Sequence, residues 1–309
     1  MNLIANHPKM RSSAPNGSSR AEVPTAGPHA HAPIRGAAAL AVGASSLLAL
    51  ALVTSAAPAG ADLPEIRSRG TLRVITHLEG GSPAFSGPNP SRPGLDLEIL
   101  KGFASLEKVP LEIVEVSGGS DLRVAALIAG RGDIVAGRLA VTAEGSRRVA
   151  FSAEFFPVRF VIVTRHPSPA VTTPVELRGY RVGTVGTSQA LMGAVNQAQV
   201  PSSQVDASFK EPSDMWEGLR SGRVTAIIAS LDMALIAQMA DPDLRVGGFV
   251  GVPSSFVFGL RKEDVALLTA LDAYLGNFRK GSSWNRLVVK YFGDKALELL
   301  RAAGEGKQP

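Results

Sequence analysis

Arg138 and Ser230 have residue types and positions that suit the binding of a small polar ligand. Each stands eight residues after a glycine, just beyond a short aliphatic run. The two segments share a leucine, a Gly-Arg pair and that aliphatic run, and they read Leu127-x-x-Gly130-Arg131 then Ile134–Ala136, and Leu219-x-x-Gly222-Arg223 then Ile227–Ala229. Ligands gather beyond the carboxyl ends of strands in open α/β sheets. We therefore expect Arg138 and Ser230 to face one crevice.

A small-residue turn over residues 183–189, GTVGTSQ, is a further candidate. It separates a predicted strand over 180–185 from a helix predicted to begin near Ser188. Backbone N–H groups at such a helix start attract anionic groups, and the hydroxyls of Thr187 and Ser188 add donors. The spacing leaves an ordinary N-cap open as the alternative.

Motifs of common catalytic sites are absent from the sequence. It contains no G-x-S-x-G, P-loop, G-x-G-x-x-G or H-E-x-x-H pattern. Cysteine is absent, and only His77 and His166 follow residue 61, so we expect no metal site and no cofactor. Asp96 and Glu98 lie two residues apart on a predicted helix and do not face each other, so we expect them to act in capping and solvation.

Strand-like and helix-like periodicities alternate along the sequence, which indicates an α/β fold with parallel strands. These strands and helices must position the residues named above. Strands are predicted over 71–76, 111–116 and 133–136. One helix opens at 94–96 with Asp96 as its N-cap, and others cover 121–129, 267–278 and 284–292. The tail 304–309 is expected to fray. A length of 309 residues suits two domains. The repeated segment described above predicts two similar α/β lobes.

Residues 1–61 resemble an export signal with a long polar leader. Arg35 precedes an uncharged apolar run over 36–57, and the small residues 59–61 offer a cleavage site before Asp62. We therefore expect a periplasmic protein, with an uncleaved N-terminal membrane anchor as the alternative. The net charge of +5 is not clustered in one segment, so nucleic-acid binding is not expected.

From Ile66 to Gly293 the sequence resembles the family 3 extracellular solute-binding proteins, periplasmic receptors that deliver polar amino acids to ABC transporters. The resemblance rests on short segments in order: 66–74 (IRSRGTLRV), 94–98 (GLDLE), 132–136 (GDIVA), Thr142 nine residues before Phe151-Ser152, 186–188 (GTS), 222–226 (GRVTA), 258–262 (FGLRK) and 290–293 (KYFG). It implies a periplasmic-binding-protein-like fold of two α/β lobes, joined by crossing hinge strands near 160–164 and 255–260. The implied parts are the signal peptide with its leader (1–61), the first part of lobe 1 (62–159), lobe 2 (160–254), and the return to lobe 1 with the C-terminal helices (255–309).

The same resemblance implies ligand-binding positions, which are Glu79, Phe85, Arg138, Ala140, Thr142, Thr187, Ser188 and Ser230. Amino-acid receptors of the family place an Arg where this chain has Gly145 and an Asp where it has Ser230. Both charge partners of a zwitterion are therefore missing from their usual places. We expect Arg138 to bind a ligand carboxylate instead, and the ligand to be a small polar, anionic solute. Arg147 and Arg148 are expected on a solvated helix face.

Two stretches, 82–85 (SPAF) and 228–246, also resemble the receptor-like module of membrane-bound lytic transglycosylases. The given sequence ends some sixteen residues after Gly293. We therefore expect no peptidoglycan cleavage from it, while the sensing of a cell-wall fragment stays open.

The leading hypothesis is a monomeric, non-enzymatic binding protein that captures a small molecule and delivers it to an ABC permease in the inner membrane. One alternative is a periplasmic lyase similar to cyclohexadienyl dehydratase, which would need a general acid and has Glu79 as its candidate. Another alternative is a sensory or accessory binding subunit.

Overall fold

The computed structural model describes residues 62–79 and 82–309. The predicted signal segment 1–61, with its apolar run and cleavage site, lies outside the described residues. The strands are β1 (Leu72–Thr76), β2 (Leu111–Glu115), β3 (Ile134–Ala140), β4 (Ala150–Phe151), β5 (Phe156–Arg165), β6 (Val182–Gly183), β7 (Val205–Asp206), β8 (Ala226–Ser230) and β9 (Leu244–Leu260). The helices are α1 (Leu63–Arg69), α2 (Leu95–Leu106), α3 (Ser120–Ile128), α4 (Ala143–Arg148), α5 (Gln189–Gln197), α6 (Pro212–Arg220), α7 (Leu231–Ala240), α8 (Val265–Phe278), α9 (Ser282–Phe292) and α10 (Ala296–Gly304).

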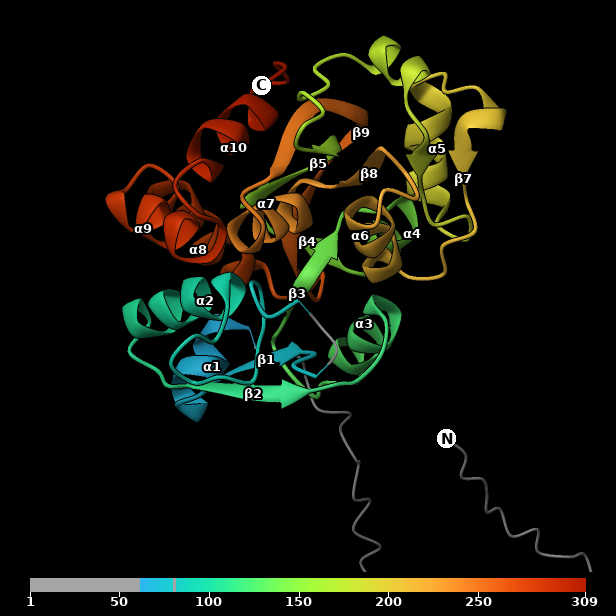
Figure 1. Cartoon of the computed structure of the whole chain (residues 1–309). Helices are drawn as coiled ribbons and strands as arrows, with labels where there is room; N and C mark the ends of the chain where they lie inside the picture. The colour runs from blue at the N-terminus through green and yellow to red at the C-terminus, as the bar shows by residue number, and fades with distance from the viewer. Residues whose placement is uncertain (1–61, 80–81) are drawn as a thin grey trace, which may run out of the picture. The chain divides into compact units, whose positions relative to one another are not determined.

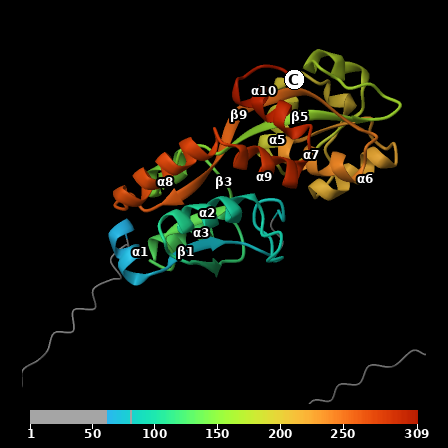
Figure 2. The same cartoon turned by 90° about the vertical axis from the view of Figure 1, so that its left-hand side faces the viewer.

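Two groups of parallel strands flank a central antiparallel pair, β5 and β9. The sheet order is β2-β1-β3-β9-β5-β8-β6-β7, with β4 on β9. Figure 1 shows α2 and α3 beside β1 and β2, and α5 and α6 beside β8, and Figure 2 shows α2 and α3 beside β1 from another side. We call the β1–β3 group with its helices the first lobe and the β6–β8 group with its helices the second lobe. The predicted hinge segments fall within β5 and β9, which confirms two lobes joined by two crossing strands.

The repeated sequence unit forms the same structure twice, as α3–β3 and as α6–β8. Gly130 and Gly222 end the two helices with φ of +73° and +76°. Each following strand has a parallel neighbour on one side, β1 or β6, and an antiparallel crossing strand, β9 or β5, on the other. Each lobe therefore contains its own copy of the same helix–strand unit, as the sequence predicts.

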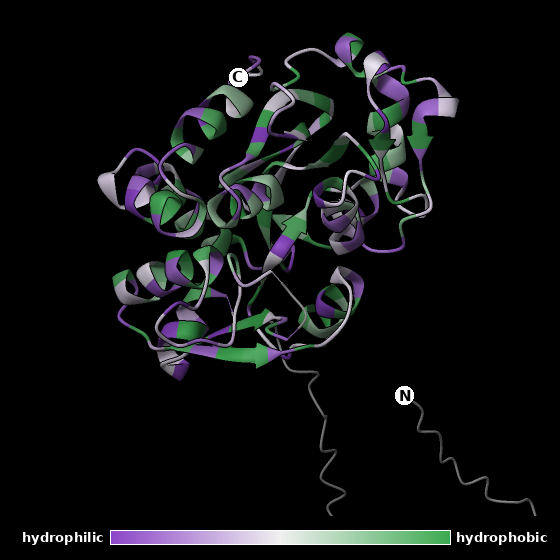
Figure 3. Ribbon diagram, viewed as in Figure 1, coloured by the Kyte–Doolittle hydropathy of each residue, from purple (hydrophilic) through white to green (hydrophobic). Residues whose placement is uncertain are grey.

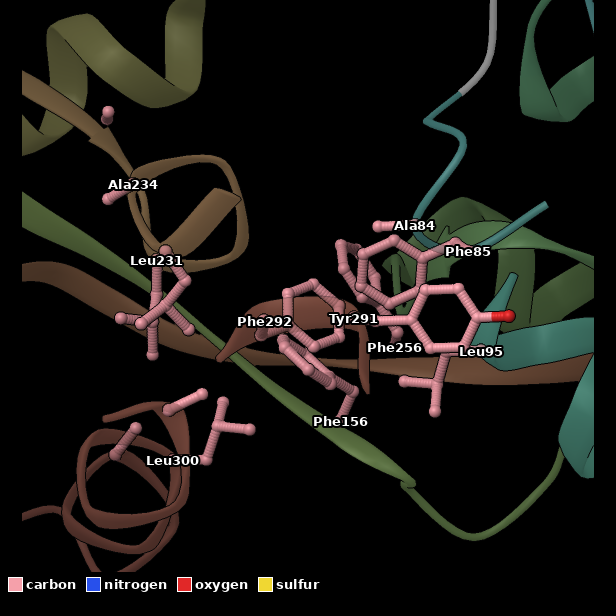
Figure 4. Packing of buried hydrophobic residues seen from close by; sticks show 14 of the residues in the cluster. Ala84, Phe85, Leu95, Phe156, Leu231, Ala234, Phe256, Tyr291, Phe292 and Leu300 are labelled. Carbon is pink, nitrogen blue, oxygen red and sulfur yellow. The ribbon is translucent and has the colours of Figure 1, made fainter. Parts of the chain in front are cut away.

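Aromatic rings join the first lobe to the crossing strands and to α9. The Phe85 ring, in the loop before α2, meets the rings of Phe156, Phe256 and Phe292 at centroid distances of 5.2, 5.1 and 5.4 Å. Figure 4 shows these four side chains gathered together. Figure 3 shows hydrophobic residues gathered on the central strands and mixed colours on the helices. This packing fixes the end of β9 against the first lobe.

Three predicted elements differ from the structure. The strand expected over 180–185 is reduced to β6, because Val185 leaves the ladder and pairs with Ser208 in an isolated bridge. The strand expected over 133–136 extends to Ala140 as β3. The tail expected to fray is tied back, because the Gln308 side chain both accepts from and donates to the backbone of Phe249, at 2.7 and 3.2 Å. None of the helices in 62–79 and 82–309 is long and apolar enough to span a bilayer.

Candidate functional site

Arg138 lies near the carboxyl end of β3 in an unusual backbone conformation. Its φ is +58°, and the preceding Gly137 has φ of +90°. A left-handed backbone costs a residue with a side chain about 1–2 kcal/mol, whereas glycine adopts it freely. The two residues also interrupt the pairing of β3 with β9, whose register shifts between Val135 and Leu139. Such strain persists only where the surroundings hold it in place.

The Asp96 carboxyl stabilises this turn through hydrogen bonds to its backbone. Its Oδ2 accepts hydrogen bonds from the backbone N–H groups of Gly137 at 2.8 Å and Arg138 at 3.2 Å. The carboxyl is fully buried, and burial raises its pKa to about 7, against the opposing effect of these hydrogen bonds and of the Arg138 and Arg123 charges. The expected N-cap role is wrong, because Gly94 is the N-cap of α2 and Asp96 lies inside the first turn.

The Arg138 side chain forms an ion pair between the lobes. Its Nη2 lies 2.8 Å from Oδ2 of Asp232, the second residue of α7. Asp232 is 1% exposed, whereas the Arg138 side chain keeps 33% of its surface exposed. The guanidinium also lies over the rings of Phe256 and Phe85, at 5.2 and 5.8 Å from their centroids. The pair therefore joins β3 of the first lobe to α7 of the second.

Two cavities share Arg138 and Met233 in their linings. One has a volume of about 490 Å³ and many polar lining groups: His77, Ser82, Pro83, Phe85, Ser86, Gly119, Ser120, Arg123, Gly137, Arg138, Met233 and Ile236. We call it the polar cavity. The other, the apolar cavity, has a volume of about 280 Å³ and is lined by Arg138, Val158, Phe160, Ser188, Leu191, Pro212, Met215, Trp216, Ala229, Ser230, Met233 and Phe256. Arg138 and Ser230 face the same apolar cavity, as their matching positions predict.

Arg123 brings a second guanidinium to the polar cavity. It is largely buried on α3 and donates to the carbonyl oxygens of Gly118 at 2.9 Å and Gly137 at 3.1 Å. Burial lowers its pKa, and the nearby Asp96 opposes that shift. Sequence reasoning did not identify Arg123, because an arginine in the middle of an amphipathic helix usually faces solvent.

The predicted ligand-binding residues divide between the cavities and the surface. Phe85 lines the polar cavity, and Ser188 lines the apolar cavity while its Oγ caps α5 by accepting from the N–H of Leu191 at 3.4 Å. The N-cap that the sequence leaves open for the 183–189 turn is therefore present at Ser188, and anion binding there stays a prediction. Glu79 and Thr187 are exposed and line neither cavity.

Thr142 and Ala140 also lie outside both cavities. The Thr142 Oγ1 accepts from the N–H of Gly145 at 2.9 Å and caps α4. Arg147 is exposed, as the sequence predicts, whereas Arg148 is half-buried and lies 3.9 Å from the exposed Asp121.

No group of three side chains suited to metal binding occurs within residues 62–79 and 82–309. The polar groups that meet at Arg138 are a second arginine, serine hydroxyls and a buried aspartate. Such groups recognise a small charged or polar molecule by ion pairing and hydrogen bonding.

The sequence matches the family model for bacterial extracellular solute-binding proteins, family 3, over residues 73–294. The chain belongs to this family. Its relatives include the membrane-bound lytic murein transglycosylase F of Stutzerimonas stutzeri, 29% identical over 246 residues, which cover 78% of this chain and 50% of that protein. The histidine-binding periplasmic protein of Salmonella typhimurium is 24% identical over 210 residues, which cover 64% of this chain and 78% of that protein. The chain thus spans about half the length of the transglycosylases it matches.

Solved structures share the two-lobed fold. The unliganded, open L-cystine receptor of Neisseria gonorrhoeae matches with a TM-score of 0.65 at 16% identity, covering 76% of this chain and 98% of that one. A mutant of the T. maritima protein ArgBP matches with a TM-score of 0.53 at 26% identity, covering 74% and 98%. The family and the two-lobed fold that the sequence resembles are confirmed.

Proposed function

We propose that this protein binds a small zwitterionic solute of the amino-acid type at Arg138 and Asp232. The observation that carries the proposal is the ion pair of these two residues, one from each lobe, of which Arg138 lines both cavities. Arg138 offers a planar pair of donors for a carboxylate, and Asp232 offers an acceptor for an ammonium. A zwitterion that enters when the lobes separate gives each residue a new partner of opposite charge.

An anionic solute, the expectation drawn from the sequence, is the second candidate. That expectation rests on the lack of an acid at Ser230, but Asp232 supplies one two residues later. An anion that takes Arg138 from Asp232 leaves a buried carboxylate without a partner, which costs several kcal/mol. The specific observation in favour of an anion is the second guanidinium, Arg123, at the polar cavity. The name of the histidine-binding relative supports the zwitterion.

The proposal includes the cellular role predicted from the sequence: export to the periplasm, a monomeric receptor, and delivery of the solute to an ABC permease of the inner membrane. Family membership supports it. A lyase similar to cyclohexadienyl dehydratase would need an acid in contact with the ligand, and the exposed Glu79 lines neither cavity. The transglycosylase relatives support a sensory or accessory role as the remaining alternative.

Isothermal titration calorimetry with amino acids and their matched hydroxy acids tests the proposal. We expect the amino acid of each pair to bind more tightly, because only it carries the ammonium. Arg138→Gln is expected to weaken binding by about 2–5 kcal/mol, or roughly 30- to several-thousand-fold, while the exposed control Arg147→Ala stays near wild type.

Asp232→Asn separates the two candidates. For a zwitterionic ligand it should remove the preference for the amino acid over the hydroxy acid. Hydroxy acids that bind the wild type as tightly as amino acids, with no loss in Asp232→Asn, would replace the proposal with the anionic candidate.

A further inference from the structure

The apolar cavity combines an aliphatic and aromatic wall with a few polar groups at one place. Its wall is contributed by β5, α5, α6, β8, α7 and β9, and the largest side chains in it include those of Phe160, Leu191, Met215, Trp216 and Phe256. Its polar groups are Arg138, Ser188 and Ser230. An apolar chamber with a few convergent polar groups is the usual form of a small-molecule site.

We propose that this cavity receives an apolar side chain of the ligand, so that the substrate class is aliphatic and aromatic amino acids. The inference rests on the proposed function. A carboxylate bound by Arg138 lies in the cavity that Ser188, at the start of α5, also lines. The α-carbon of the ligand then stands at the entrance of the apolar cavity, and its side chain extends inward.

The lining also argues against a cationic side chain. Among residues 62–79 and 82–309, no carboxylate lines either the apolar or the polar cavity. Asp232 is taken by the ligand ammonium in the proposed binding mode. A guanidinium or ammonium on the ligand side chain would therefore lose its water without gaining a partner, which is unfavourable. We therefore expect discrimination against arginine and lysine.

The polar cavity is the competing place for the side chain. It is lined by serines and by Arg123, so it suits a polar or acidic group. The apolar cavity is favoured because Ser188 and Ser230, the donors from the second lobe, open into it and not into the polar cavity. A ligand held by both lobes therefore has its charged end at the apolar cavity.

Tryptophan fluorescence gives a direct readout, because Trp216 lines the apolar cavity and the chain has two tryptophans. The other is Trp284 on α9, which packs against Phe156 and Phe278. A Trp284→Phe protein leaves Trp216 as the reporter, and calorimetry on the same protein gives affinities. The ligands are glycine, alanine, leucine, phenylalanine, arginine and glutamate.

We expect leucine or phenylalanine to bind about 10- to 150-fold more tightly than alanine, as burial of a large apolar side chain predicts, and to shift the Trp216 emission. Arginine and glutamate should bind more weakly than leucine. Leu191→Gln should lower the affinity for leucine and phenylalanine by a larger factor than that for glycine. The matched control is Leu106→Gln, which changes an exposed leucine of α2.

The outcomes separate this inference from the proposed function. Equal affinity for all six amino acids would overturn the apolar side-chain pocket and leave the zwitterion site standing. Tightest binding of glutamate, with no change in Trp216 emission, would place the side chain in the polar cavity and overturn the inference. If none of the amino acids binds, the proposed function fails and the inference fails with it.

Discussion

The two ends of strand β3 each carry a cluster of arginine and aspartate side chains. At one end several arginines surround one aspartate, and at the other an arginine pairs with a single aspartate. Directly before the strand, Asp133 is fully buried and surrounded by Arg69 at 2.5 Å, Arg73 at 3.2 Å and Arg261 at 3.8 Å. Near the far end, Arg138 has one carboxylate partner, Asp232, at 2.8 Å, and borders two cavities. The first cluster buries Asp133 completely, whereas the second leaves the Arg138 side chain 33% exposed.

This difference teaches how one strand serves both stability and binding. The Asp133 cluster joins α1, β1 and the end of β9 within the first lobe. Opening of the lobes therefore does not separate its ion pairs. The Arg138 pair joins two lobes across the hinge strands, so it is separated whenever the lobes open. An ion pair that opens with the lobes can be replaced by a ligand.

Asp133→Ala should have the largest effect on stability. It leaves three arginines without their shared acid, and Arg261 is 4% exposed. Removing one partner of a buried ion network costs about 3–5 kcal/mol. Urea unfolding should show this loss. The control Asp243→Ala, in a pair that is half exposed, should cost at most about 1 kcal/mol. Similar losses in both variants would mean that the Asp133 cluster is no stronger than a surface pair.

Sequence reasoning found one cluster member and missed its partners for a physical reason. Arg138 was found because the repeated glycine spacing places it beyond a strand. Asp232 was missed, and Asp96 was assigned to capping and solvation, because acids in the first turn of a helix are usually solvated, and burial is set by what packs against that turn. In the chain, α7 begins directly after β8, which brings the first turn of α7 against the first lobe. That juxtaposition follows from tertiary structure alone.

Asp96→Asn should change the pH dependence of stability. The folded pKa of Asp96 is raised to about 7 from 3.8. Between about pH 4 and pH 7 the folded state therefore binds more protons than the unfolded state, and stability falls as pH rises. This contribution reaches about 2 kcal/mol between pH 5 and pH 7, at about 1.4 kcal/mol per unit.

The measurement is urea unfolding of Asp96→Asn and wild type at several values of pH from 5 to 8. The variant should lose this part of the slope and be the more stable protein at pH 8. Asp121→Asn, which changes an exposed acid, should keep the wild-type slope. An unchanged slope in Asp96→Asn would show that Asp96 does not titrate in this range, and that Gly137 and Arg138 are held by a permanent charge.

Arg138→Ala should cost less stability than Asp133→Ala, although it also removes the partner of a buried acid. The lobes can separate and return Asp232 to water, so we expect a loss of about 1–3 kcal/mol. Small-angle X-ray scattering without ligand should show a larger radius of gyration than wild type. The double variant Arg138→Ala/Asp232→Asn should recover part of the stability. A cost equal to that of Asp133→Ala would show that Asp232 stays buried and that the pair is structural.

Thr142→Ala should have the smallest effect on stability and on ligand affinity. It decides whether Thr142 caps α4 or contacts the ligand, as the family resemblance implies. In the structure its Oγ1 caps α4, and it lines neither cavity. Loss of a threonine cap costs about 1 kcal/mol, and Thr142→Ser should restore it. Because α4 is a short, exposed helix, the cap should not reach the site at Arg138, and the ligand affinity should stay within about twofold. A tenfold loss of affinity in Thr142→Ala that Thr142→Ser restores would instead place the hydroxyl in contact with the ligand. The binding site would then extend beyond the carboxyl end of β3 to the start of α4.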